Sequence, residues 1–167
     1  MNYTIRIARR AFERARNDVV RPHAFAYERV AFLWGRTAPI APNEYLVLLH
    51  DFTPIEDSQY VADDTVGARI GSVAIRAALG RVLETGESCF HFHVHPHHGR
   101  PQLSRTDAVE LDHLIPTFVS GAPKAVHGAL IASADSANAW AWRREAGRTG
   151  ASTVALIGFP TEIWRSV

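Results

Sequence analysis

Apolar and polar residues follow each other along the chain in patterns that predict several strands. Residues 28–35 and 44–52 are apolar runs of strand length, and Pro39 and Pro42 between them mark a turn. A weaker alternation over residues 3–7 predicts an edge strand. The remaining strand candidates are residues 89–95, 126–133, 137–143 and 153–159.

Three further segments carry the periodicity of amphipathic helices, with apolar residues recurring every three or four positions. They are residues 8–20, 71–84 and 104–119. Gly86 is a suitable stop for the second helix, and Pro116 is expected to kink the third helix or end it early. The order of elements predicts an α/β (α+β) fold, in which a central mixed β-sheet is flanked by two or three helices.

Composition narrows the class of protein. A chain of 167 residues, 47% hydrophobic and 21% charged, predicts one globular domain over residues 1–167. The net charge of +1 gives no broad electrostatic reason to bind nucleic acid or an anionic membrane. No apolar stretch is long enough to span a bilayer, and residues 1–10 lack the apolar core of a secretory signal. We therefore expect a soluble, cytoplasmic protein.

Histidine is concentrated in one strand candidate, in the run His-Phe-His-Val-His-Pro-His-His over residues 91–98. Side chains of a strand alternate between its faces, so Cys89, His91, His93 and His95 are expected to share one face. Two imidazoles at i and i+2 can converge on one zinc ion, whereas His91 and His95 are roughly 13 Å apart at Cα and cannot easily do so. We select His93 and His95, because Pro96 places this pair at the end of the strand, where clefts form.

A catalytic zinc ion needs a third protein ligand and one open position. Asp107 is the nearest acidic candidate after the strand. It also completes a Ser-x-x-Asp capping pattern with Ser104, and this pattern by itself predicts only the start of a helix. The two interpretations are compatible, since a cap fixes the helix end that would hold the ligand. His97 and His98 are expected to face solvent.

These residues resemble the signature of the JAMM metalloproteases, whose domain is also called JAB or MPN. The matching motifs are His93-x-His95-Pro and Ser104-x-x-Asp107, with an upstream Glu28 that opens an apolar run ending in Gly35. The stretch that begins at His127 also resembles the strand after the ligand helix of the family. The resemblance covers residues 5–165, and the loop between His95 and Ser104 is one residue longer than usual.

The resemblance implies a single MPN-like domain and a zinc-dependent peptidase or isopeptidase. In that family pattern His93, His95 and Asp107 hold Zn²⁺, Glu28 is the general base and Ser104 helps to stabilise the oxyanion. The compact length resembles bacterial members that act beside ubiquitin-like conjugation systems, some of them in antiviral defence. The implied partners are a ubiquitin-like protein or its conjugates, with the activating and conjugating enzymes of the same pathway.

Other functions remain open at this point. Zinc deaminases need a pair of cysteines and zincins need His-Glu-x-x-His on a helix, and the sequence has neither. A hydrolase of small molecules or of a sulfur-carrier protein, and an MPN-like binding module without catalysis, remain alternatives. The acidic segment over residues 53–67 is expected to be a surface loop. Its part from Glu56 to Asp64 is a candidate wall for a basic substrate tail.

Overall fold

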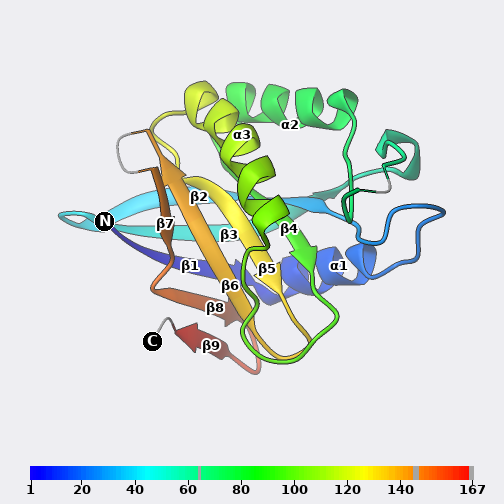
Figure 1. The fold of residues 1–167 in the computed structure, drawn as a ribbon. Coiled ribbons are helices and arrows are strands. Elements are labelled where there is room, and N and C mark those ends of the chain that lie inside the picture. The colour runs from blue at the N-terminus through cyan, green and yellow to red at the C-terminus, as the bar shows by residue number, and fades with distance from the viewer. Residues whose placement is uncertain (64, 145–146, 166–167) are drawn as a thin grey trace.

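The computed structural model describes residues 1–63, 65–144 and 147–165, so that Asp64 of the acidic loop lies outside the described residues. The described chain is a mixed α+β fold with three α-helices around one curled, mixed sheet (Figure 1). The helices are α1 (Arg9–Val19), α2 (Ser72–Thr85) and α3 (Arg105–Gly121), and a short 3-10 helix covers Asp57–Gln59. None of the described helices has both the length and the apolar character needed to cross a membrane.

The described strands form one sheet in the order β7-β6-β5-β4-β2-β3-β1-β8-β9. Strand β1 pairs in parallel with β3 and β8, β4 pairs in parallel with β5, and the other pairs are antiparallel. Their bounds are β1 (Asn2–Ala8), β2 (Ala31–Ala41), β3 (Glu44–Pro54), β4 (Ser88–Val94), β5 (His127–Ala132), β6 (Ala137–Arg143), β7 (Gly147–Gly150), β8 (Thr153–Ile157) and β9 (Glu162–Arg165).

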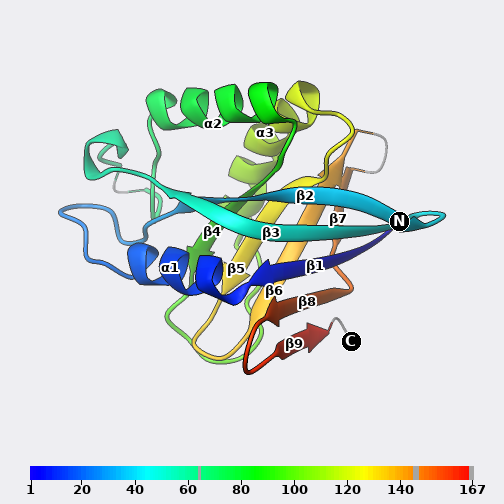
Figure 2. The same ribbon diagram turned by 180° about the vertical axis from the view of Figure 1, so that it is seen from behind.

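Both faces of the sheet are covered, because α1 lies on one side and α2 and α3 lie on the other (Figures 1 and 2). Phe12 of α1 packs with Phe90 and Phe92 of β4 in one buried cluster. Cys89 of β4 belongs to the other cluster, together with Phe118 of α3. The alternation predicted for the histidine strand is therefore confirmed: its phenylalanines face α1 and its other face turns toward α2 and α3.

Several sequence expectations needed correction. Residues 3–7 do form a strand, but β1 is paired on both sides and is not an edge. The turn between β2 and β3 lies at residues 42–43, where Asn43 has a φ of 60°, and Pro39 lies inside β2. Proline is tolerated there because β2 pairs with β4 only over residues 31–35, which leaves one side of Pro39 without a neighbouring strand. Pro116 lies inside α3 and does not end it.

Two short strands were not predicted at all, β7 and β9. The strand expected over residues 28–35 is shifted to Ala31–Ala41, and the other strand and helix candidates are found at nearly the expected residues. Gly86 ends α2 in the left-handed conformation with a φ of 66°, as its position after the apolar periodicity predicted. The fold brings the end of β4 against the start of α3 and the loop before β2, and this junction is where the predicted site residues meet.

Candidate metal centre

A row of imidazoles runs along one face of β4 and continues past its end. The ring centroids of His91 and His93 are 5.5 Å apart, and those of His93 and His95 are 4.9 Å apart. His95 follows the last residue of β4, and its backbone N–H donates to the carbonyl of Ala132, the last residue of β5. The parallel pairing with β5 thus fixes the backbone on which His93 and His95 stand.

The predicted pair points its Nε2 atoms at one another, at a distance of 3.1 Å. Two ligands of a tetrahedral zinc ion at about 2.0–2.1 Å are separated by roughly 3.3–3.4 Å, so the observed spacing suits a shared cation. The Asp107 carboxylate lies beside both rings, with Oδ1 3.8 Å from Nε2 of His93 and Oδ2 3.9 Å from Nε2 of His95. The three predicted ligands therefore converge.

Asp107 is held in place by the start of α3. Ser104 is the N-cap: its hydroxyl accepts a hydrogen bond from the backbone N–H of Asp107 at 3.0 Å. In return, Oδ2 of Asp107 accepts from the backbone N–H of Ser104 at 2.9 Å. The predicted capping box is confirmed, and it leaves Oδ1 of Asp107 facing His93.

Glu28 reaches the same place from a loop rather than from a strand. We expected it to open a strand, but β2 begins only at Ala31. The backbone of residues 28–30 leaves the sheet because its polar groups bind elsewhere: the N–H of Glu28 donates to the carbonyl of Gly67 at 3.0 Å, and both backbone groups of Val30 bind the hydroxyl of Tyr60. One carboxylate oxygen of Glu28 and one nitrogen each of His93 and His95 lie within 4.8 Å of one another.

The electrostatics suit a cation. Burial lowers the pKa of His93 and of His95 and keeps both rings neutral, which is the form that binds metal. Burial also raises the pKa of Glu28, and the charge of Asp107 raises it further. For Asp107 burial acts in the same upward direction. Hydrogen bonds from Ser104 and electrostatic interactions with His93 and His95 outweigh it and lower the pKa of Asp107.

Two imidazoles and two carboxylates, with no basic side chain pairing with them among the described residues, are a donor set that zinc accepts. Three of these donors are enough for a catalytic ion, which keeps an open position. His93, His95 and Asp107 were the predicted ligands. Because one oxygen of Glu28 lies within 4.8 Å of a nitrogen of each imidazole, the geometry allows Glu28 to act either as a ligand or, as predicted, as a base beside the ion.

The remaining histidines of the run take other places. His97 and His98 are exposed, as expected. His91 stands next to His93, and its Nδ1 is buried without a hydrogen-bond partner among the described residues. His91 lies in the wall of a pocket beside the centre rather than in the ligand set.

Three adjoining cavities surround these side chains. A central cavity of about 240 Å³ is lined by Glu28, His95, Ser104 and Asp107. On the α3 side it shares Glu28 and Asp107 with a pocket of about 440 Å³, and on the α1 side it shares Glu28 and His95 with one of about 720 Å³. Part of the acidic loop does form a wall, since Asp63 lines the α3-side pocket, where it pairs with Arg69.

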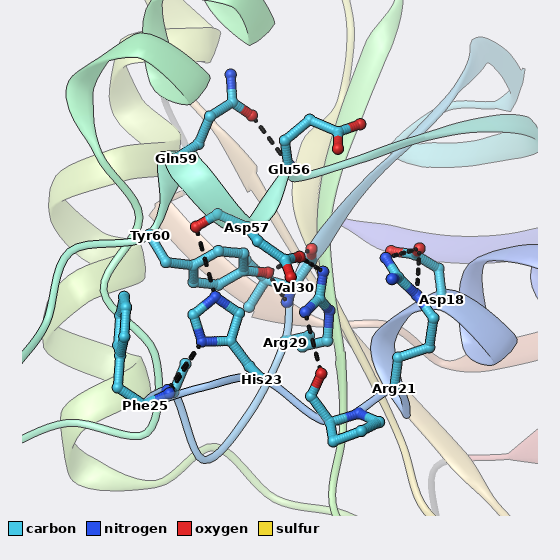
Figure 3. Close-up of polar contacts among 12 residues, drawn as sticks. Asp18, Arg21, His23, Phe25, Arg29, Val30, Glu56, Asp57, Gln59 and Tyr60 are labelled. Atoms are coloured by element: carbon cyan, nitrogen blue, oxygen red, sulfur yellow. Dashed lines mark hydrogen bonds and ion pairs between the residues drawn. The ribbon is translucent and has the colours of Figure 1, made fainter.

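A polar network behind Glu28 was missed by the sequence analysis. The guanidinium of Arg29 is buried and pairs with Asp57, and it lies over the ring of Tyr60 (Figure 3). These contacts fasten the 3-10 helix to the residues that precede β2. The sequence signal for this network is an arginine directly after the predicted base, because a charged residue inside an apolar run is unusual.

Comparison of the sequence with models of protein families gives no match, and comparison with curated proteins gives none either.

Proposed function

We propose that this protein is a zinc-dependent peptidase or isopeptidase of the JAMM type, with an MPN-like fold. It would cleave an amide bond at the C-terminus of a ubiquitin-like protein. The observation that carries the proposal is the convergence of Glu28, His93, His95 and Asp107 from three separate segments of the chain. The order and spacing of the motifs resemble that family, and the cavities on both sides of the centre leave room for a polypeptide.

His93, His95 and Asp107 would hold the ion. When bound, zinc lowers the pKa of water to about 7 and polarises a carbonyl group. Glu28, with its raised pKa, takes a proton from the attacking water and returns it to the leaving amine. Ser104 lines the same cavity, and its hydroxyl would donate a hydrogen bond to the developing oxyanion.

The α3-side pocket is the proposed site for the tail of the ubiquitin-like protein. Its lining includes the apolar side chains of Ile75, Leu111 and Leu114 together with the carboxylates of Asp63 and Glu110. Such a lining suits a tail in which apolar and basic residues alternate. The α1-side pocket then receives the part of the substrate that leaves with the amine.

Metal content and turnover test this proposal separately. We expect about one zinc ion per chain in the wild type and in Glu28→Gln, which keeps the shape of the side chain. Turnover of ubiquitin-like proteins with a C-terminal peptide tag should fall at least about 100-fold in Glu28→Gln. His98→Ala is the matched histidine control, because His98 is exposed and lies outside the three cavities.

Near-normal turnover in Glu28→Gln would assign the base to another carboxylate. Cleavage of amino-acid conjugates alone would favour a small-molecule hydrolase. Bound zinc without cleavage of either class of substrate would favour a binding module.

A further inference from the structure

The α1-side pocket is built from segments that the proposed chemistry does not use. Besides Glu28 and His95, its wall comes from the end of α1, the loop that follows it, Pro96 and Ala134. Its volume of about 720 Å³ lies within the range of about 300–1,000 Å³ that is typical of ligand pockets. Several residues of an extended peptide therefore fit beside the centre.

Three arginines line this pocket, and two of them are already neutralised. Arg21 pairs with Asp18 and Arg29 pairs with Asp57 (Figure 3). Arg16, in the last turn of α1, instead donates to two backbone carbonyls, those of Ser133 at 2.8 Å and Ala134 at 3.4 Å. Among the described residues no carboxylate pairs with Arg16, so its positive charge at the pocket wall has no counter-charge bound to it.

The pocket on the other side of the centre has the opposite charge. Glu110 and Asp63 line it, and of these only Asp63 has a basic partner, Arg69. A carboxylate on the substrate would be repelled there and attracted toward Arg16. Because Glu28 lines both pockets, the difference in charge between them comes from Arg16 on one side and Glu110 on the other.

We propose that the α1-side pocket binds an acidic segment of the substrate polypeptide, with an Asp or Glu side chain paired to Arg16. A guanidinium suits this task because its planar N–H groups match a carboxylate, and the carbonyls of Ser133 and Ala134 hold it in position beforehand. That this segment lies on the amine side of the cleaved bond rests on the proposed function, which places the tail in the other pocket.

Binding can be measured without catalysis, so the two proposals can fail independently. We would titrate the full-length, ¹⁵N-labelled, zinc-loaded protein with a blocked hexapeptide of alternating Gly and Glu, and with its Gln and Lys analogues. In NMR spectra, saturable chemical-shift changes at the backbone amides of Val20 and Tyr27, both in the pocket wall, are expected for the Glu peptide only. Affinity should fall by about tenfold or more in Arg16→Gln and should weaken as salt rises.

Arg10→Gln is the matched control, because Arg10 is an exposed arginine of the same helix outside the pocket. Loss of the carbonyl contacts of Arg16 could unfold the variant, so Val20 supplies a second test. Val20 is 58% exposed at the pocket wall, and Val20→Glu should repel the peptide whereas Val20→Gln should not.

Equal binding of the Lys peptide, an unchanged affinity in both Arg16→Gln and Val20→Glu, or shifts that do not saturate would overturn the proposal. Specific binding of the Glu peptide by a protein that cleaves no amide would leave it standing and refute the proposed function alone.

Discussion

Gly67 is expected to set the position of the Glu28 carboxylate. The two residues are joined by a backbone hydrogen bond, from the N–H of Glu28 to the carbonyl of Gly67. A Cβ atom added at Gly67 would lie 3.0 Å from Oε2 of Glu28 and 3.1 Å from its Cδ. The φ of Gly67 lies outside the left-handed region, so Gly67→Ala introduces this contact without straining the backbone.

The size of the effect follows from the contact. Nonbonded atoms are comfortable at about 3.5 Å or more, so the carboxylate must retreat by about half an ångström. A misplacement of about 1 Å in an active site can cost about 100-fold in rate. We therefore expect kcat to fall about tenfold in Gly67→Ala, equivalent to about 1.4 kcal/mol, with little change in KM.

The assay is steady-state cleavage of a substrate that the wild type turns over, with zinc content and Tm measured on the same preparations. Gly80→Ala is the matched control, because a Cβ at Gly80 in α2 meets nothing within 4 Å. That change should leave kcat unaltered and stabilise the fold by about 0.5–1 kcal/mol.

A full complement of zinc with unchanged kcat in Gly67→Ala would refute the reasoning. Loss of zinc in Gly67→Ala would also count against it, because it would mean that the added methyl group disturbs the ligands rather than the base.

Three further predictions concern the centre and the core. Asp107→Asn keeps an acceptor for the capping box but removes the negative charge. Its zinc content should therefore fall below about a tenth of the wild-type value, with a small change in Tm. The His91→Ala variant should keep its zinc. Ser104→Ala should lower kcat by about 100-fold or more and destabilise the protein by about 1 kcal/mol through the lost cap, both measurable on one preparation. Buried His127 accepts from the N–H of Cys89 and donates to the carbonyl of Ala122, and burial lowers its pKa to about 4 from 6.5. Because the folded state resists protonation of His127, the free energy of unfolding falls as pH falls from 6.5 to 4, by about 3 kcal/mol at most. Urea unfolding of His127→Leu should show a smaller decrease in this free energy over the same interval than the wild type.

Local sequence patterns were sufficient to predict most of the helices and strands, and the positions of His93 and Asp107 in the candidate site. The alternation over residues 89–95 predicted which face of β4 carries His93, because side chains of a strand alternate whatever their neighbours are. The Ser-x-x-Asp spacing predicted the start of α3, because a cap involves only residues one turn apart. The stop at Gly86 was equally local.

Features that depend on distant residues could be seen only in the tertiary structure. The pairing of β1 on both sides requires β3 and β8, which lie far along the chain. Glu28 lies in a loop before β2 rather than in the strand that the apolar run predicts, because Gly67 and Tyr60 form hydrogen bonds with the backbone of Glu28 and Val30. The charge difference between the two pockets likewise arises from folding, since the ion pairs of Arg21 and Arg29 leave only Arg16 without a carboxylate partner among the arginines of the α1-side pocket. The sequence by itself determined which residues have the chemistry of a metal centre, and tertiary packing decided which of them meet and with what charge around them.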